Sequence, residues 1–168
     1  MTKTLNSVYF IRHGETDYNK ADLFTGSTDV ALNNVGRIQA QDAAKKLSSF
    51  NIEEIWTSPL IRAKETAEII SANLNLPVVT FSVMAERHFG RLEGKLKNSV
   101  DRKTLPDDAE NEVDFHQRAK EVLSLICKRN KNILIVSHSG IFKGISRILN
   151  NNEDVELKID NCEIVKIY

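Results

Sequence analysis

An arginine, a histidine and a glycine stand side by side near the start of the chain, at Arg12, His13 and Gly14. The preceding residues, 8–11, are aromatic or β-branched, which is typical of a buried strand, and the glycine ends that pattern. Ligands of open α/β sheets collect at the carboxyl ends of strands, where both side chains would lie. A neutral imidazole is a nucleophile for phosphorus and a guanidinium holds anionic oxygens, so the pair suits phosphoryl chemistry. The alternative is an ordinary strand that ends in these residues.

A second histidine, His138, follows the most apolar run of the chain, residues 132–137. That run favours a central parallel strand, and Ser139 and Gly140 come directly after the histidine. Because parallel strands present their carboxyl ends at one edge of a sheet, we expect His13 and His138 to meet there. Ser139 either contacts phosphate or caps the following helix, and we favour the cap.

Arg62 supplies a second guanidinium. Ser58 and Pro59 favour a helix start just before it, with the serine as the N-cap and the proline at the first helical position. Arg62 then lies in the first turn, near the positive end of the helix dipole, where phosphate is favoured. The alternative is an arginine that only covers surface.

The composition is that of an ordinary globular protein. The chain has 168 residues, 41% of them hydrophobic, which is enough for one domain over residues 1–168. Lysine plus arginine equals aspartate plus glutamate at 23 each, so we expect neither nucleic acid nor membrane as a partner. The start of the chain lacks an apolar signal segment, so we expect a cytoplasmic location. Cys127 and Cys162 lack metal-ligand spacing and are expected to be reduced core residues.

The remaining patterns alternate between strand and helix. Further strands are expected at residues 52–57 and 77–81, and helices at 34–48, from 58 to before 77, from 111 onward, and after 140. Residues 155–159 and 163–167 favour a closing hairpin or edge pair. This alternation predicts an α/β fold, a three-layer helix–sheet–helix sandwich with a mostly parallel sheet.

Five motifs, in order along nearly the whole chain, carry a family resemblance. They are Arg12-His13-Gly14-Glu15-Thr16 with Asn19; Phe24-Thr25-Gly26; Ser58-Pro59-Leu60-Ile61-Arg62-Ala63; Glu86-Arg87-His88-Phe89-Gly90-Arg91-Leu92-Glu93-Gly94; and Val136-Ser137-His138-Ser139-Gly140. With these motifs the chain resembles the histidine phosphatase superfamily, which contains cofactor-dependent phosphoglycerate mutases, fructose-2,6-bisphosphatase-type domains and α-ribazole phosphatases. The resemblance implies a phosphoglycerate mutase-like fold.

The resemblance also implies a role for each matched residue. His13 resembles the nucleophile that becomes phosphorylated, and Glu86 resembles the general acid that later activates water as a base. Arg12, Arg62 and His138 complete the catalytic set. The residues expected to bind the phosphoryl group are Arg12, Asn19, Thr25, Gly26, Arg62, His138 and Ser139. Gly14 O is a candidate to hold the tautomer of His13. Because the arginines supply positive charge, neither a metal nor a cofactor is expected.

Basic residues gather between positions 86 and 103. They form either a solvated surface or a rim that attracts small anions, and Arg87, His88 and Lys95 are the candidates for a rim at the substrate mouth. His116 lies off the apolar stripe of its predicted helix and is expected to be structural or exposed.

The motifs leave the reaction open between hydrolysis and phosphoryl transfer. The Phe-Thr-Gly and Glu-Arg-His-Phe-Gly stretches resemble the mutase branch. Mutases carry a long insertion after the position of Gly94 that covers the site, whereas here only residues 95–110 precede the next predicted helix. An uncovered site admits water, so we expect a phosphatase acting on a small phosphate ester. The alternatives are a phosphoglycerate mutase with a shortened lid, which would need 2,3-bisphosphoglycerate, and a non-catalytic phosphate-recognition module.

Overall fold

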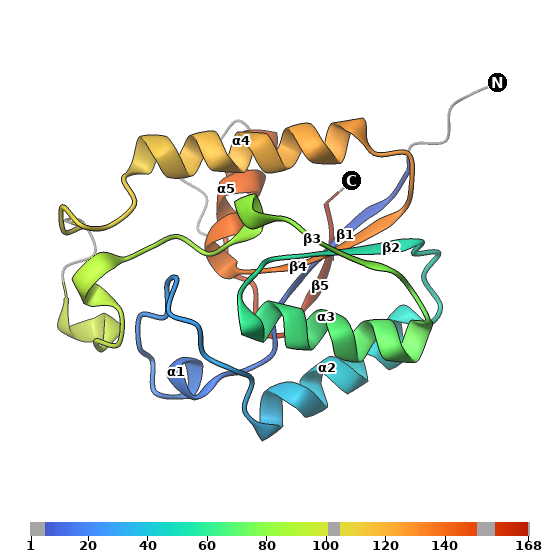
Figure 1. Cartoon of the computed structure of the whole chain (residues 1–168), viewed down its shortest axis with the longest axis horizontal. Helices are drawn as coiled ribbons and strands as arrows, with labels where there is room; N and C mark the ends of the chain where they lie inside the picture. Colours follow the sequence, from blue (N-terminus) through green and yellow to red (C-terminus); the bar gives the residue numbers. More distant parts are fainter. Residues whose placement is uncertain (1–5, 101–104, 151–156, 168) are drawn as a thin grey trace.

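A sheet in the middle of the protein carries helices on both faces (Figure 1). The structure is a computed structural model that describes residues 6–100, 105–150 and 157–167. Its elements in these residues are, in chain order, β1 (Val8–Arg12), α1 (Asp17–Lys20), α2 (Asn34–Leu47), β2 (Glu54–Thr57), α3 (Ile61–Leu74), β3 (Val78–Thr80), η1 (Ser82–Met84), η2 (Gly90–Leu92), η3 (Lys97–Ser99), α4 (Glu112–Lys128), β4 (Ile133–Ser137), α5 (Ser139–Asn150) and β5 (Ile164–Lys166).

The sheet brings the two histidine-bearing strands together. Its strands lie in the order β3-β2-β4-β1-β5, with the first four parallel and β5 antiparallel to β1. Arg12 lies opposite Ser137 in the pairing of β1 with β4, so residues 13 and 138 leave the sheet at the same edge. This arrangement confirms the predicted α/β fold with a mostly parallel sheet.

Alternating side chains of the central strands build a core on each face of the sheet. Phe10 and Ile135 belong to the apolar cluster on the side of α4 and α5, whereas Ile11 and Val136 belong to the cluster on the side of α2 and α3. All four side chains are fully buried. Each such side chain stabilises the fold by roughly 1.5–3 kcal/mol. The two cores therefore make the sheet a firm support for the groups at its edge.

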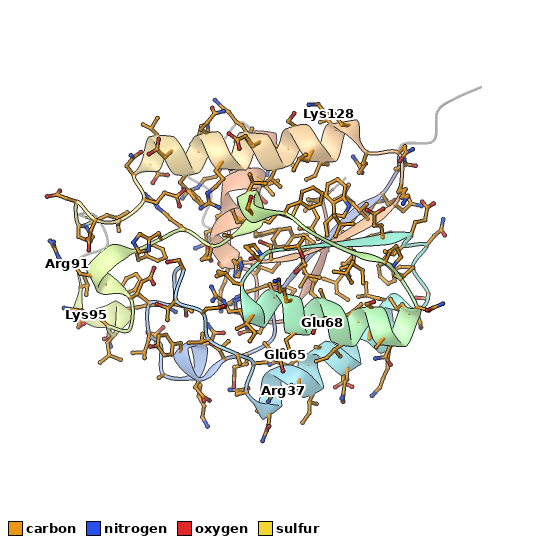
Figure 2. All side chains as sticks on the ribbon, viewed as in Figure 1. Arg37, Glu65, Glu68, Arg91, Lys95 and Lys128 are labelled. Atoms are coloured by element: carbon orange, nitrogen blue, oxygen red, sulfur yellow. The ribbon has the colours of Figure 1, made fainter. Side chains whose placement is uncertain are left out.

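Small residues bring α2 and α3 together. Ala43 of α2 and Ala67 of α3 are buried in one apolar cluster. On the outer side, Arg37 Nε donates to Glu65 Oε1 at 2.6 Å (Figure 2). A partly exposed pair of this kind contributes at most about 1 kcal/mol, so the apolar contact does most to join the helices. Among the described residues, no helix has both the length and the apolar character needed to cross a membrane.

Helix α3 begins at Ile61, which corrects the predicted start. Ser58 is not the N-cap and Pro59 is not the first helical residue. The capping side chain comes from a distant loop, since Asp29 Oδ1 accepts from Ile61 N–H at 2.6 Å. Arg62 nevertheless lies in the first turn, as predicted.

The predicted hairpin at the end of the chain is wrong, although its second half is an edge strand. Within residues 157–167 only β5 is a strand, and it pairs with β1. Two further backbone bonds extend this pairing, from Cys162 N–H to Arg12 O and from Ile167 N–H to Val8 O, both at 2.9 Å. Residues 155 and 156 lie outside the described residues. Residues 157–161 form no strand and pass Arg12, whose Nη1 donates to Ile159 O.

The prediction that both cysteines are core residues is wrong for Cys127, whereas Cys162 packs against the apolar cluster on the side of α2 and α3. Both are free thiols, but Cys127 is exposed and Cys162 is half-buried. Ile126 takes the inward position of α4, so its neighbour Cys127 faces outward. Burial raises the pKa of the Cys162 thiol to about 12. His116, on the same helix as Cys127, is exposed.

Candidate active site

The end of β1 fixes the backbone and the ring of His13. Its N–H donates to Ser137 O at 2.9 Å, and its Nδ1 lies 2.7 Å from Gly14 O. Gly14 N–H donates to Thr66 Oγ1 of α3 at 3.0 Å. Only glycine fits at position 14, because a Cβ there would lie 2.4 Å from Gly36 O. The nucleophile expected from the sequence is therefore held by backbone groups on both sides.

The partners of the His13 ring define its tautomer. A carbonyl oxygen only accepts, so Nδ1 carries the proton that points at Gly14 O. Nε2 then has a lone pair, which accepts from Arg62 Nε–H at 3.2 Å. Burial lowers the pKa of His13 well below its ordinary value, and the charges of Arg62 and Arg12 lower it further. The imidazole is thus neutral, and its unprotonated nitrogen, Nε2, lies on the side of the guanidinium groups.

Arg62 is completely buried, and three acceptors hold its guanidinium. Besides the bond to His13, Nη1 donates to Thr28 O at 2.8 Å and Nη2 donates to Gly26 O at 2.7 Å. Both carbonyl groups belong to the turn of residues 26–28, in the loop between α1 and α2. Burial lowers the pKa of Arg62 to about 10, so the side chain remains a cation near neutral pH.

His138 follows β4, and its ring packs against that of His13. The ring centroids are 5.1 Å apart and the planes meet at 59°, which confirms that the two strand ends converge. Its Nε2 lies 2.7 Å from Ser58 Oγ, whereas its buried Nδ1 has no hydrogen-bond partner in the described part of the chain. Burial lowers the pKa of His138 well below its ordinary value, and Arg62 adds to this effect. His138 therefore lies close behind His13 as a second neutral imidazole.

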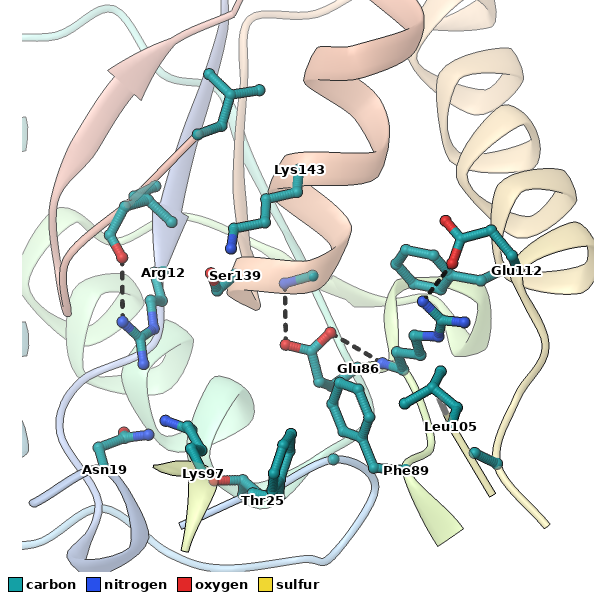
Figure 3. A pocket seen from close by; sticks show the side chains of 18 of the residues that line it. Arg12, Asn19, Thr25, Glu86, Phe89, Lys97, Leu105, Glu112, Ser139 and Lys143 are labelled. Carbon is teal, nitrogen blue, oxygen red and sulfur yellow. Dashed lines mark hydrogen bonds and ion pairs between the residues drawn. The ribbon is translucent and has the colours of Figure 1, made fainter. Parts of the chain in front are cut away.

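Glu86 lies across the site from Arg12 (Figure 3). Its Oε2 accepts from Gly140 N–H at 3.0 Å, and its Oε1 accepts from Arg87 N–H at 2.9 Å. A Cβ at position 140 would lie 2.1 Å from Glu86 Oε1, so glycine there permits the close approach. The first turn of α5 thus holds the carboxylate beside the cavity.

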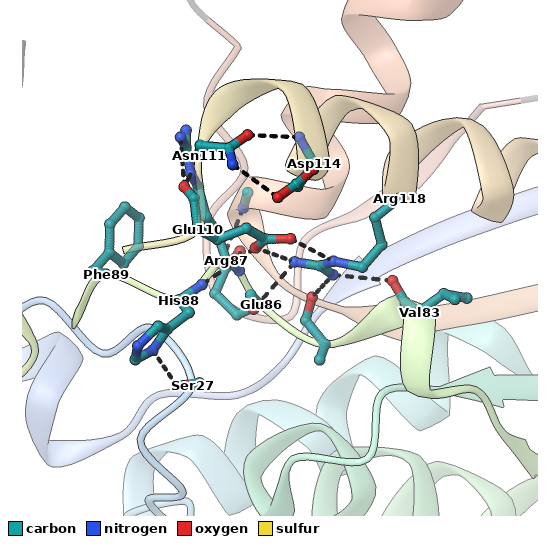
Figure 4. Close-up of polar contacts among 12 residues, drawn as sticks. Ser27, Val83, Glu86, Arg87, His88, Phe89, Glu110, Asn111, Asp114 and Arg118 are labelled. Carbon is teal, nitrogen blue, oxygen red and sulfur yellow. Dashed lines mark hydrogen bonds and ion pairs between the residues drawn. The ribbon is translucent and has the colours of Figure 1, made fainter. Parts of the chain in front are cut away.

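An arginine of α4 holds the segment that carries Glu86. Arg118 donates to Val83 O at 3.1 Å and to Ala85 O, and its Nε donates to Glu110 Oε1 at 2.8 Å (Figure 4). The sequence offered no signal for this role, because a single arginine beside the apolar stripe of a helix is an ordinary surface residue.

A cavity of about 980 Å³ joins these groups. This volume is at the upper end for small-molecule sites, which span about 300–1,000 Å³. The predicted site residues that line it are Arg12, His13, Asn19, Thr25, Gly26, Arg62, Glu86, Arg87 and Ser139. His138 is not among its lining residues. In the described residues, no group of three or more His, Cys, Asp or Glu side chains is placed to hold a metal ion.

Arg12 and Asn19 lie on the β1 side of the cavity. Arg12 Nη1 donates to Ile159 O at 3.0 Å, while its buried Nε has no hydrogen-bond partner among the described residues. Asn19 Oδ1 accepts from Thr16 N–H at 3.1 Å and from Asn161 Nδ2 at 3.3 Å, which orients its amide. Burial lowers the pKa of Arg12, and the charge of Glu86 opposes this effect.

Two of the three predicted rim residues lie away from the cavity. Arg87 lines it and pairs with Glu112 at 2.6 Å. His88 instead turns toward Ser27, whose Oγ lies 2.7 Å from His88 Nδ1 (Figure 4). Lys95 is exposed at the periphery of the protein (Figure 2). The predicted cap is also wrong, since Ser139 is itself the first residue of α5.

Further cations line the cavity: Lys97 belongs to the basic segment noted in the sequence, whereas Lys143, Arg147 and Lys158 were missed. Lys143 and Arg147 follow Ser139 by four and eight residues, so all three share one face of α5. That spacing is the signal that could have found them. Lys97 reaches the cavity from η3 and pairs with Asp22 Oδ1 at 3.2 Å. The cavity therefore has more positive charge than one phosphate pocket requires.

The comparison with known families identifies proteins that share these motifs. A family model described as the histidine phosphatase superfamily (branch 1) matches residues 8–168. The chain belongs to this superfamily. The match includes both strand ends, the first turn of α3 and the segment around Glu86.

Relatives of this chain have names of two kinds. A Bacillus subtilis protein described as uncharacterized phosphatase PhoE is 36% identical over 140 residues, which cover 80% of this chain and 72% of that protein. A probable phosphoglycerate mutase, GpmB, of Erwinia tasmaniensis is 31% identical over 179 residues, which cover 95% of this chain and 83% of that protein.

A solved structure has the same fold. A mycobacterial glucosyl-3-phosphoglycerate phosphatase matches with a TM-score of 0.85 and 23% identity, over 96% of this chain and 90% of that chain. At this identity the likeness concerns the fold, and it confirms the phosphoglycerate mutase-like architecture.

Proposed function

We propose that this histidine phosphatase hydrolyses a small phosphate ester through a phosphohistidine on His13, with Glu86 as general acid and then general base. The contact of 2.7 Å between His13 Nδ1 and Gly14 O carries the proposal, because it leaves the lone pair on Nε2. Because the pKa of His13 is lowered, the lone pair stays unprotonated even at pH values below the ordinary pKa of histidine. Relatives named as phosphatases support hydrolysis.

The phosphoryl group binds between the two guanidiniums. Arg62 Nε–H, which now donates to His13, turns to a phosphoryl oxygen, and the unpartnered Arg12 Nε–H gains an acceptor. Asn19 and Ser139 add polar contacts from the wall of the cavity, and His138 supports the pocket from behind His13. The two guanidiniums stabilise the charge that spreads over the equatorial oxygens in the transition state.

In the first step, His13 Nε2 attacks phosphorus and the bond from phosphorus to the ester oxygen breaks. Glu86, in its protonated form, gives its proton to that leaving oxygen, and the alcohol departs. The phosphoryl group is then bonded to Nε2, and the proton stays on Nδ1, which continues to donate to Gly14 O.

In the second step, the Glu86 carboxylate takes a proton from a water molecule whose oxygen attacks phosphorus. The bond from phosphorus to Nε2 breaks, its electron pair returns to the imidazole, and inorganic phosphate leaves. The positive charge comes from Arg12 and Arg62, so this reaction needs neither a metal nor a cofactor. Lys97, Lys143 and Arg147 favour substrates that are themselves anionic.

The test measures p-nitrophenyl phosphate hydrolysis and traps the phosphoenzyme by rapid acid-free denaturation. His13→Ala is expected to lower kcat by about 10⁴-fold or more and to abolish the phosphoenzyme, because the nucleophile is gone. His116→Ala, which changes an exposed histidine of α4, is the matched control and should leave kcat and the yield of phosphoenzyme unchanged. Turnover by His13→Ala close to that of the unmodified protein would reject the mechanism.

The similarity to GpmB over 95% of the chain favours one second candidate, a phosphoglycerate mutase. A mutase would interconvert 3-phosphoglycerate and 2-phosphoglycerate, and 2,3-bisphosphoglycerate would stimulate it. Phosphorus NMR of the reaction distinguishes the two, since a phosphatase yields inorganic phosphate and glycerate. We expect inorganic phosphate.

A further inference from the structure

The carboxylate of Glu93 joins two loops of the site. Its side chain is only 11% exposed. Oε1 accepts from Ser27 N–H at 2.8 Å and from Phe89 N–H at 3.0 Å, and Oε2 accepts from Thr28 N–H at 2.9 Å. The hydroxyl groups of Ser27 and Thr28 donate to the same carboxylate. The catalytic steps above make no use of this group.

The turn that Glu93 holds is the one that orients Arg62. Thr28 O and Gly26 O accept from the two terminal nitrogens of the guanidinium at 2.8 Å and 2.7 Å, and Arg62 Nε donates to His13 Nε2 at 3.2 Å. A continuous chain of hydrogen bonds therefore runs from the Glu93 carboxylate through the 26–28 turn to the nucleophile.

The shape of the turn matches the carboxylate closely. Gly26 has a φ of +52°, in the left-handed region that favours glycine, and a Cβ there would lie 2.1 Å from Glu93 Oε1. On the other side, the bond from Phe89 ties Glu93 to the segment that also carries Glu86. Glu93 thus connects the two walls of the site. One wall carries Arg62, the hydrogen-bond donor to the phosphoryl group, and the other carries the general acid.

We propose that Glu93 is a positioning residue for phosphoryl transfer, which sets the place of Arg62 by holding the 26–28 turn against the segment that carries Glu86. This inference rests on the proposed function and adds a requirement to it. A carboxylate at position 93 is needed for kcat although it touches neither the substrate nor the reacting atoms.

An amide at position 93 cannot replace the carboxylate. The backbone N–H groups of Ser27, Thr28 and Phe89 can only donate, and they approach both oxygens of Glu93. The NH₂ group of a glutamine would therefore face at least one N–H group and displace it. Burial raises the pKa of Glu93, but the donors, Thr28 Oγ1 foremost, outweigh it and lower the pKa to about 2. The residue is thus a carboxylate at every usual assay pH.

The first experiment compares Glu93→Gln with a matched control, Glu54→Gln. Glu54 has a side chain that is 15% exposed, pairs with Lys131, and accepts from Trp56 Nε1 at 3.0 Å at the opposite end of β2 from the site. Glu93→Gln is expected to lower kcat on p-nitrophenyl phosphate by about 30-fold, since a misplacement of about 1 Å costs up to about 100-fold. Glu54→Gln should lower only the Tm. A kcat for Glu93→Gln equal to that of the control would overturn the proposal.

A double-mutant cycle tests whether the effect passes through Arg62. In the Arg62→Lys background, where the forked donor is already lost, Glu93→Gln should lower kcat by less than about threefold. The same loss of about 30-fold in both backgrounds would show that Glu93 acts independently of Arg62, which would overturn the proposal.

A readout without turnover separates this inference from the proposed function. The ¹⁵Nε–H resonance of Arg62 reports its bond to His13, and Glu93→Gln is expected to shift it and to speed its exchange with water, whereas Glu54→Gln is not. A protein inert toward every phosphate ester would refute the function, and an unshifted Arg62 signal would refute the role of Glu93. If Glu93→Gln fails to fold, Thr28→Val removes one donor to the carboxylate and should give smaller changes of the same sign. No change in that variant would also overturn the proposal.

Discussion

The ends of β1 and β4 place the same side chain at the same edge of the sheet but give it different partners. His13 Nδ1 meets a carbonyl oxygen and its Nε2 meets Arg62 beside the cavity. His138 Nε2 meets the hydroxyl group of Ser58, and its ring is fully buried outside the set of cavity-lining residues. Both rings have a lowered pKa, so charge alone does not distinguish them.

The difference between the two histidines lies in whether the neighbouring oxygen can donate a hydrogen bond or only accept one. Gly14 O can only accept, which fixes the proton of His13 on Nδ1 and the lone pair on Nε2. Ser58 Oγ can donate or accept, so it leaves both tautomers of His138 open. Of the two neutral imidazoles, only His13 has a fixed lone pair beside the cavity, which is why we propose it as the nucleophile and His138 as a supporting group.

The largest expected effect is the contrast between His13→Asn and His138→Asn. His13→Asn should lower kcat by about 10⁴-fold or more and abolish the phosphoenzyme, because it removes the attacking nitrogen. His138→Asn should lower kcat by about 10²-fold, the cost of losing one group that supports the transition state, and phosphoenzyme should still form on His13. Stopped-flow hydrolysis and mass spectrometry of the trapped enzyme measure both. Equal losses in the two variants would contradict the division of roles.

The meeting of these histidines could be predicted from the sequence because only local patterns and parallel topology were needed. Two apolar runs each end in a histidine, and parallel strands share their carboxyl edge. The position of Arg62 in the first turn of α3 could also be predicted, even though the capping residue could not. Asp29 caps that helix from 32 residues away, and no local pattern indicates which loop will reach it.

Contacts between distant segments account for what the sequence analysis missed. Glu86 accepts a hydrogen bond from Gly140, 54 residues away. His88 was expected at the substrate mouth but is hydrogen-bonded to Ser27, 61 residues away. The loops hold many carboxylate acceptors and many backbone N–H donors, so many pairings are possible, and tertiary packing alone selects one. The sequence therefore predicts which residue types gather at the edge, whereas their partners come only from the structure.

The second prediction concerns the stability of the fold at acidic pH, to which His13 and His138 should contribute alike. In the unfolded chain the pKa of a histidine is about 6.5, and burial lowers the pKa of His13 and His138 in the folded chain. As the pH falls below about 6.5, the unfolded chain binds protons first, so the free energy of unfolding is highest above this pH and declines below it. The slope is at most about 1.4 kcal/mol per pH unit for each histidine.

Urea unfolding at pH 7.5, 6.5 and 5.5 measures this slope. His138→Asn should reduce the decline between pH 6.5 and 5.5 by up to about half, because one of the two buried imidazoles is gone. His116→Asn, which changes an exposed histidine, should leave the decline as it is. An unchanged slope in His138→Asn would mean that this imidazole takes up protons equally well in both states.

The smallest expected effect tests the partner of His138, a hydroxyl group that also accepts from Leu60 N–H at 3.2 Å. Ser58→Ala removes the hydroxyl group that lies 2.7 Å from His138 Nε2 and leaves that nitrogen buried without a partner, at a cost of about 1–3 kcal/mol in the free energy of unfolding. Because His13 keeps its own partners, kcat should fall only about fivefold, equivalent to about 1 kcal/mol. Ser146→Ala, which changes another buried serine, is the control and should leave kcat unchanged. A loss as large as that of His138→Asn would show that the Ser58 hydroxyl, by fixing a tautomer, makes the second imidazole as specific as the first.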